Sequence, residues 1–264
     1  MIAAVLLLAV GVGDLVRRRL SGTAQPIVGL VVAAAILLIA GVGYAGPLGI
    51  APVTTGIAAV IAALWMLAVR INETVTPPLW PAALLVTAVT LGAMLTPWSA
   101  EPVFVVPGTT KLEPGVALAV LAVVAALTTT ANLVTRAMLQ VARGSHPGQG
   151  VHPDSRWVMR WGRRRALVIE REDAESTPPA APSTLQGGRI IGPLERLLIV
   201  ALALVGAHGL IAALLAAKGI VRFPEISADR RLGSKAEEFL IGSLTSWALA
   251  GLAVALVARA SGAA

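Results

Sequence analysis

Cysteine is missing from this sequence, and charged residues make up only 13% of it. The lack of cysteine excludes disulfides, thiolate metal sites and thiol nucleophiles. A soluble chain would carry roughly 25% charged residues, so this chain has too few polar groups to cover its surface in water. Histidine occurs only three times, and the three positions are too scattered to suggest a metal site. We therefore predict no metal and no cofactor.

Long apolar blocks are what the sequence does contain. Hydrophobic residues make up 56% of the 264 positions, and the mean hydropathy is +0.82. Blocks of about 20 apolar residues match the roughly 30 Å hydrocarbon core of a bilayer. We predict an all-α fold, a polytopic transmembrane helix bundle with about seven spans and one basic cytoplasmic loop. The expected spans are Ile2–Val16, Pro26–Tyr44, Pro52–Val69, Leu79–Trp98, Pro114–Leu139, Leu194–Ala217 and Phe239–Val257.

The order of apolar and basic residues predicts the orientation. The N-terminal apolar run precedes the cations Arg17, Arg18 and Arg19, which is the reverse of a signal peptide. Because cytoplasmic loops are enriched in Lys and Arg, the N-terminus is expected outside and the first, third and fifth loops inside. The net charge of +7 then reflects orientation and not nucleic-acid binding. The sequence favours a multi-pass protein of a bacterial inner membrane.

The sixth block disagrees with this scheme. Residues 218–235 carry five cations, yet simple alternation places them outside. Either the balancing acidic residues neutralise this loop, or the block Leu194–Ala217 does not span and turns back at Gly206–Gly209 as a re-entrant hairpin, since glycine weakens helices. Of the two, we favour the straight span.

One polar loop, at residues 140–193, separates helices one to five (1–139) from a C-terminal two-helix unit (194–264). Arginine interleaved with tryptophan is typical of a segment on an anionic membrane surface, and Ala166–Ile169 is expected to form a short strand. The predicted lipid-headgroup contacts are Arg156, Trp157, Arg160, Trp161, Arg163, Arg164 and Arg165.

Polar side chains within the apolar blocks are costly in a membrane, so each is a candidate functional residue. Asp14 either pairs at the membrane surface with Arg18, one helical turn on, which we favour, or lies buried against other helices. Thr128, Asn132 and Arg136 recur every four residues and so share a helix face. That face either makes interhelical hydrogen bonds, which we favour, or lines a polar pathway.

Three strings in the C-terminal third carry a resemblance. They are IGPLER at Ile191–Arg196, AAKGIVRF at Ala216–Phe223 and AEEFLIGSLTS at Ala236–Ser246. They resemble an uncharacterised bacterial membrane protein family called domain of unknown function 3307. The resemblance implies a membrane fold and no assigned activity. The matching positions are Glu195, Arg196, Lys218, Arg222, Phe223, Glu238, Gly242 and Ser246.

The sequence shows no nucleophile–base pair, phosphate loop or clustered metal ligands, so we expect no enzyme. The leading prediction is a structural or accessory subunit whose partners are the bilayer and other membrane subunits or a second copy of itself. The alternative is a small transporter or channel with a polar path between helices. A membrane enzyme for a lipid-linked substrate ranks last. The candidate residues are Asp14, Asn132, Arg136, Glu195, Arg196, Lys218, Arg222 and Glu238.

Overall fold

The computed structural model describes residues 1–20, 22, 24–43, 52–71, 77–95, 114–144, 156–161, 167–172, 188–227 and 234–262. Over these ranges the chain forms nine α-helices and two short strands. The elements are α1 Ile2–Arg17, α2 Ala24–Gly43, α3 Pro52–Ala68, α4 Leu79–Leu95, α5 Pro114–Thr128, α6 Thr130–Gly144, β1 Arg156–Trp161, β2 Leu167–Glu172, α7 Gly188–Leu204, α8 His208–Ser227 and α9 Ser234–Ala260.

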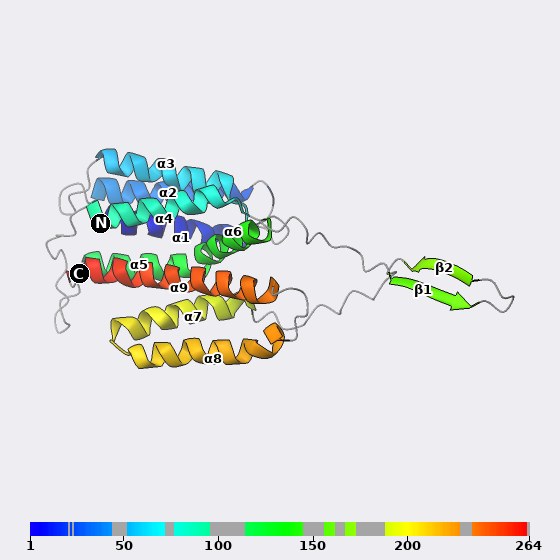
Figure 1. The fold of residues 1–264 in the computed structure, drawn as a ribbon. Helices are drawn as coiled ribbons and strands as arrows, with labels where there is room; N and C mark the ends of the chain where they lie inside the picture. The colour runs from blue at the N-terminus through cyan, green and yellow to red at the C-terminus, as the bar shows by residue number, and fades with distance from the viewer. Residues whose placement is uncertain are drawn as a thin grey trace.

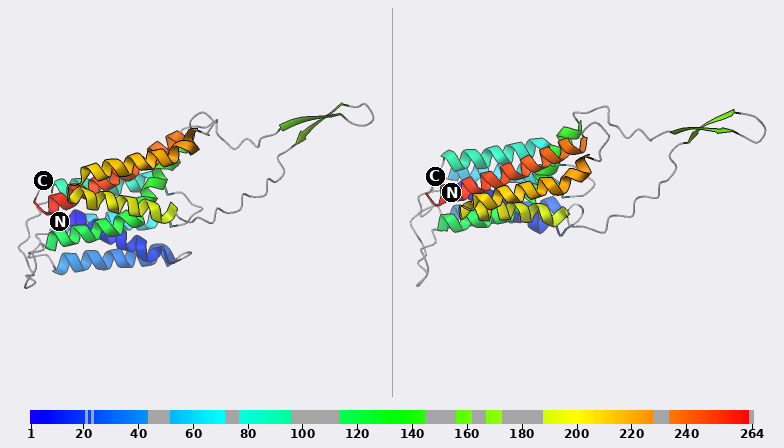
Figure 2. Two further views of the ribbon diagram at one scale, coloured as in Figure 1. Left: turned by 90° about the horizontal axis from the view of Figure 1, so that it is seen from below. Right: turned by 60° about the horizontal axis from the view of Figure 1, so that its bottom comes forward.

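The helices lie side by side in one bundle, and both chain termini lie at the same end (Figure 1 and Figure 2). At the other end α1, α3, α6 and α8 finish, and α2, α4, α7 and α9 begin (Figure 1). We call this second end the basic end, because arginines concentrate there, as described below. The end with the two termini is called the opposite end.

Helix α1 is the centre of the N-terminal part and packs against α2, α3, α4 and α5. Small residues allow this because they let helix backbones approach closely. A Cβ at Gly11 would lie 2.8 Å from the backbone nitrogen of Ala126. Glycine at this position therefore permits the close α1–α5 contact, and a larger residue would push the two helices apart.

The fifth apolar block is not one straight helix, and the prediction of a continuous span at Pro114–Leu139 needs correction. Helix α5 ends at Thr128, α6 begins at Thr130, and the two are bent by 46°. Three consecutive threonines occupy the bend. β-Branched residues with a hydroxyl that can bond to the backbone favour helices less than alanine or leucine, so this is where a break is least costly.

The preferred prediction of a straight sixth span at Leu194–Ala217 is wrong. Helices α7 and α8 form an antiparallel hairpin (Figure 1) that turns at Gly206, as the alternative expected, but its arms of 17 and 20 residues are longer than the half-helices of a re-entrant hairpin. Gly206 adopts φ +74°. The Ala207 amide donates to the Leu202 carbonyl, and the Gly206 amide donates to the Ala203 carbonyl. This paired pattern with a left-handed glycine is a Schellman helix end, so local sequence chemistry ends α7.

The hairpin removes the charge conflict around residues 218–235. Because α8 runs back, its C-terminal half and the start of α9 lie at the basic end, together with the ends of α1 and α3. Exposed arginines there include Arg18, Arg19, Arg70 and Arg222. In the sequence, the segment between α4 and α5 joins helices at the opposite end, and it carries one cation, Lys111. Cations therefore concentrate at one end of the bundle.

The polar loop between α6 and α7 contributes two strands, so the all-α prediction holds for the bundle but not for this loop. β1 pairs with β2 in antiparallel register, with Trp157 opposite Arg171 and Trp161 opposite Leu167. The ribbon lies beyond the basic end of the bundle (Figure 1). The short strand expected at Ala166–Ile169 is confirmed in β2, with its start shifted to Leu167.

Two helices are long and apolar enough to cross a membrane within the ranges that the structure covers. They are Ala24–Gly41, with a mean hydropathy of 2.3, and Ala236–Ala260, with 2.0. The bent pair α5 and α6 makes a third if it counts as one span, and α3 and α4 are shorter apolar helices. Length and composition thus indicate a helical protein of the membrane type.

Candidate functional site

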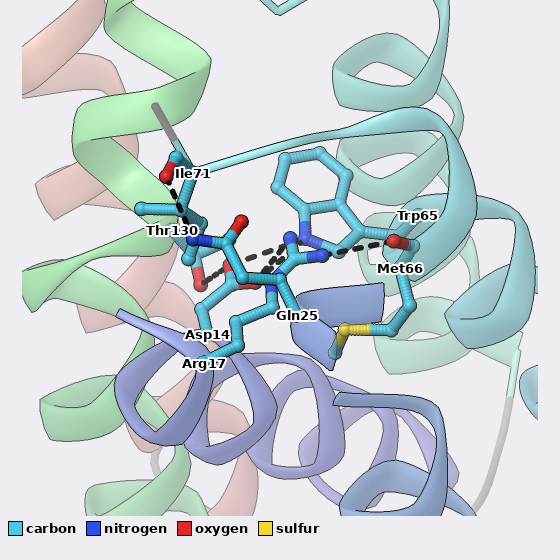
Figure 3. Close-up of polar contacts among 7 residues, drawn as sticks. All are labelled: Asp14, Arg17, Gln25, Trp65, Met66, Ile71 and Thr130. Atoms are coloured by element: carbon cyan, nitrogen blue, oxygen red, sulfur yellow. Dashed lines mark hydrogen bonds and ion pairs between the residues drawn. The ribbon is translucent and has the colours of Figure 1, made fainter. Parts of the chain in front are cut away.

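Asp14 is the centre of a buried polar cluster that joins three helices (Figure 3). Its carboxylate is 0% exposed. Oδ2 accepts a hydrogen bond of 2.6 Å from the Thr130 hydroxyl of α6. The Trp65 indole N–H of α3 donates to both oxygens, at 3.1 and 3.2 Å. We call Asp14, Arg17, Trp65 and Thr130 the Asp14 cluster.

Arg17 supplies the charge that balances Asp14. Its Nε donates to Asp14 Oδ1 at 2.8 Å, and its Nη1 donates to the Met66 carbonyl of α3 at 2.9 Å. Nη2 lies 2.7 Å from the same Oδ1 as an ion pair whose angle is unfavourable for a hydrogen bond. Beside this pair, the Gln25 amide donates to the Leu20 carbonyl. It also donates to the Ile71 carbonyl (Figure 3).

The prediction that Asp14 pairs with Arg18 at the surface is wrong. Arg18 is exposed, and the partner is Arg17, three residues after Asp14. Residues three apart on a helix lie on nearly the same face, and here that face points into the bundle. The second interpretation, a buried carboxylate facing other helices, describes the structure.

Arg196 of α7 forms a second buried cluster and is 2% exposed. Nε donates to the Leu127 carbonyl of α5 at 3.1 Å, and Nη1 donates to the Ser246 hydroxyl of α9 at 3.2 Å. Nη2 donates to Asn132 Oδ1 of α6 in a short hydrogen bond. We call Arg196, Asn132, Ser246 and the Leu127 carbonyl the Arg196 cluster. The guanidinium fork reaches acceptors on three helices at once, which suits its planar set of donors.

Next to it, Glu195 joins α7 to α8 and α9. Lys218 Nζ donates to both carboxylate oxygens of Glu195, at 2.8 and 2.7 Å. The Trp247 indole N–H donates to Glu195 Oε1 at 3.0 Å. The Lys218 ammonium also lies 5.7 Å from the centre of the Trp247 ring, within the range of a cation–π contact. This pair is the main polar link between the two arms of the α7–α8 hairpin.

Both clusters meet at the α5–α6 bend. The Leu127 carbonyl before the bend is bound by Arg196, and the Thr130 hydroxyl after it is bound by Asp14. Between them, Thr129 is 5% exposed, and its hydroxyl has no hydrogen-bond partner among the side chains and backbone that the structure describes. The bend is thus held from two sides by charged groups of other helices, with one unsatisfied hydroxyl left in it.

The structure brings some of the predicted candidate residues together and separates others. Asn132 meets Arg196, and Glu195 meets Lys218, while Asp14 lies in its own cluster. The expected shared face of Thr128 and Asn132 is interrupted by the bend, and Thr128 bonds to the Ala125 carbonyl of its own helix. Arg136, Arg222 and Glu238 belong neither to one of the two clusters nor to the Glu195–Lys218 pair.

The predicted headgroup contacts fall in and around the ribbon. Arg156, Trp157, Arg160 and Trp161 belong to β1, and residues 163–165 lie outside the described ranges. Sequence reasoning did not single out Arg17, Trp65, Trp247 or Gln25 as site residues. The only local signal was the three-residue spacing from Asp14 to Arg17. Nothing in one sequence links Trp65 to a carboxylate 51 residues away.

An apolar cavity of about 280 Å³ lies between α4 and α9, with α5 and α6 at its floor. Its walls include Val89, Val123, Leu127, Leu252 and Leu256. The transporter alternative predicts a polar cavity lined by Asp14, Asn132, Arg136, Glu195 and Lys218, and none of these five residues lines this one. In the part of the chain covered by the structure, no three His, Asp or Glu residues are grouped so that they could hold a metal ion.

Comparison of the chain with protein-family models, with curated proteins and with solved structures finds no match. The resemblance of the C-terminal third to an uncharacterised membrane family therefore stays a prediction, and the role of the two clusters rests on their geometry.

Proposed function

We propose that this chain is a multi-pass inner-membrane protein that serves as a structural or accessory subunit of a membrane complex. The observation that carries the proposal is how the buried ionic side chains are used. Asp14, Arg17 and Arg196 each bind groups on other helices. Polar contacts of this kind hold helices together in lipid, where burial of apolar surface supplies little association energy.

The proposed topology has the basic end in the cytoplasm. With α5 and α6 as one bent pass and α7 and α8 as two passes, the chain crosses an even number of times, which agrees with both termini lying at one end (Figure 1). The enrichment of arginine at the other end agrees with the positive-inside rule. The assignment to bacteria rests on the resemblance in the C-terminal third and on composition.

Helix α8 is the proposed surface for another subunit. Within the described bundle it packs mainly against α7 and α9. Its exposed side carries Gly209, Ala213 and Ala217 at intervals of four residues. Small residues at this spacing let the backbone of a second membrane helix approach closely. We expect a helix of a partner subunit to lie along this face.

The transporter alternative receives less support from the geometry. A polar path would need charged side chains that face an accessible cavity. Instead, the Asp14 carboxylate accepts hydrogen bonds from three side chains, and the Arg196 guanidinium donates to three acceptors. Each of these groups is bound by several partners within the protein, as expected for residues that hold the bundle together.

The test is the size of the complex in native membranes solubilised in mild detergent. The unaltered 27.0 kDa chain is expected to migrate within a larger assembly on a native gel. The double variant Ala213→Ile, Ala217→Ile is expected to release it, because the larger side chains prevent close helix approach. The matched control is Ala34→Ile, Ala35→Ile on the exposed side of α2, which should leave the assembly intact.

Three results would overturn the proposal. The first is recovery of the chain from the soluble fraction without detergent. The second is migration of the unaltered chain as a lone monomer. The third is an assembly that the α8 variant and the α2 control affect equally.

A further inference from the structure

The cavity between α4 and α9 has walls that suit a hydrocarbon chain. Its volume of about 280 Å³ is well above the roughly 150 Å³ of an engineered apolar cavity that stays dry and binds benzene. Its lining includes Met94, which is 71% exposed, and Leu252, which is 40% exposed, so the cavity reaches the molecular surface. An apolar cavity that reaches the surface of a membrane protein is accessible from the bilayer.

Two of the polar residues in the cavity wall are already satisfied. The Thr90 hydroxyl donates to the Val86 carbonyl at 2.8 Å, and the Thr130 hydroxyl donates to Asp14. Neither hydroxyl has a free O–H to donate to a polar ligand. The body of the cavity therefore selects for apolar material, and Thr130 places the Asp14 cluster directly behind its floor.

Arg259 is the exception in this wall. It lies in the last turn of α9 at the opposite end of the bundle and is only partly buried. It makes no hydrogen bond or ion pair with any residue in the described ranges. A cation at one end of an apolar cavity is complementary to a ligand with an anionic group on a hydrocarbon chain, since guanidinium binds phosphate through charge-assisted hydrogen bonds.

We propose that this cavity binds one acyl chain of an anionic phospholipid, with the phosphate at Arg259. The inference rests on the proposed membrane placement. The proposal places the lipid in the leaflet at the opposite end of the bundle. This leaflet is away from the arginine-rich loops, which attract anionic headgroups by charge alone. A lipid held there would fill the seam between α4 and α9.

The experiment uses the full chain, purified in mild detergent and depleted of lipid. It is titrated with phosphatidylglycerol or with phosphatidylcholine carrying the same acyl chains, and bound lipid is counted by native mass spectrometry. One phosphatidylglycerol is expected to bind about tenfold more tightly than phosphatidylcholine, the effect of one favourable charged contact. Arg259→Gln should abolish this preference. The control Arg70→Gln, which removes an exposed cation at the basic end, should retain it.

A second variant tests the apolar part. Ala93→Phe, in the cavity wall on α4, should weaken binding of both lipids while the protein still elutes as a single folded species. If Ala93→Phe does not fold, comparison of the variants Arg259→Gln and Arg70→Gln still tests the proposal.

Four outcomes would overturn the inference. They are equal affinity for the two lipids, unchanged preference in Arg259→Gln, tighter binding of a free fatty acid than of phosphatidylglycerol, and a second copy of the chain covering the cavity. Each can occur while the chain stays in the membrane fraction. Failure of the membrane proposal is seen separately, as recovery of soluble protein.

Discussion

The two buried clusters hold the same bend but differ in how their charge is balanced. In the Asp14 cluster a carboxylate and a guanidinium lie 2.7 Å apart and are both buried. In the Arg196 cluster the guanidinium binds three neutral oxygens, and the adjacent carboxylate of Glu195 is bound to Lys218 instead. The first cluster is an ion pair with neutral donors around it. The second is a cation that is hydrogen-bonded to neutral oxygens of the protein.

This difference determines what each substitution leaves behind. Removing one member of a buried ion pair leaves the other charge without a counterion in a medium of low polarity, which is strongly unfavourable. Removing a cation from neutral acceptors leaves only unsatisfied oxygens, which cost less. The two clusters should therefore respond unequally to neutral substitutions, although each contacts three helices.

Asp14→Asn is expected to have the largest effect. It preserves the shape and an acceptor for Trp65 and Thr130 but leaves Arg17 buried without its counterion. We expect a loss of about 3–5 kcal/mol in the free energy of unfolding, the usual result of breaking a buried pair. The measurement is equilibrium unfolding in mixed micelles, followed by circular dichroism.

The double variant Asp14→Asn, Arg17→Met is the control for that prediction. It removes the stranded cation, so most of the lost stability should return, as it does when both members of a buried pair are replaced. If the double variant is as unstable as Asp14→Asn alone, the charge balance does not explain the effect, and the comparison between the clusters fails.

Arg196→Met is expected to cost less, about 1–3 kcal/mol, because it leaves three unsatisfied neutral acceptors and no unpaired charge in its place. Arg196→Lys distinguishes shape from charge. Lysine keeps the cation but lacks the planar fork that reaches several acceptors, so it should be as destabilised as Arg196→Met in the same unfolding experiment. Stability equal to the unaltered protein in Arg196→Lys would mean that attraction to Glu195, and not the fork, holds α7.

The sequence predicted the class of fold well and the clusters only in part. Apolar block length depends on composition alone, so the positions of α1, α2, α3 and α9 were predictable to within a few residues. The two errors within the helix bundle are both breaks, at Thr129 and at Gly206. A break leaves hydropathy almost unchanged, and what decides it is the local backbone: a left-handed glycine at Gly206 and a run of three threonines at the bend.

For the clusters, the limit is long-range pairing. A polar residue within an apolar block can be recognised from the sequence alone, and this criterion identified Asp14, Asn132 and Arg196 as candidates. Their partners are ordinary residues in sequence terms. Thr130 lies 116 residues from Asp14, and Ser246 lies 50 residues from Arg196. Only the packing of the bundle shows which threonine, serine or tryptophan turns toward which charge.

The neighbouring threonines of the bend give the smallest and sharpest test. Thr130→Val removes a hydrogen bond to a charged acceptor and is expected to cost about 1.5–3 kcal/mol. Thr129→Val makes the same chemical change at the preceding residue, where the buried hydroxyl has no partner in the described ranges. Replacing such a hydroxyl by a methyl group of similar size removes an unsatisfied polar atom, so stability should stay the same or rise.

Both variants are compared in the same micellar unfolding assay. Equal losses would show that valine is harmful at the bend through the backbone. A loss confined to Thr130→Val would show that the Asp14 cluster, acting through one hydroxyl, fixes the start of α6.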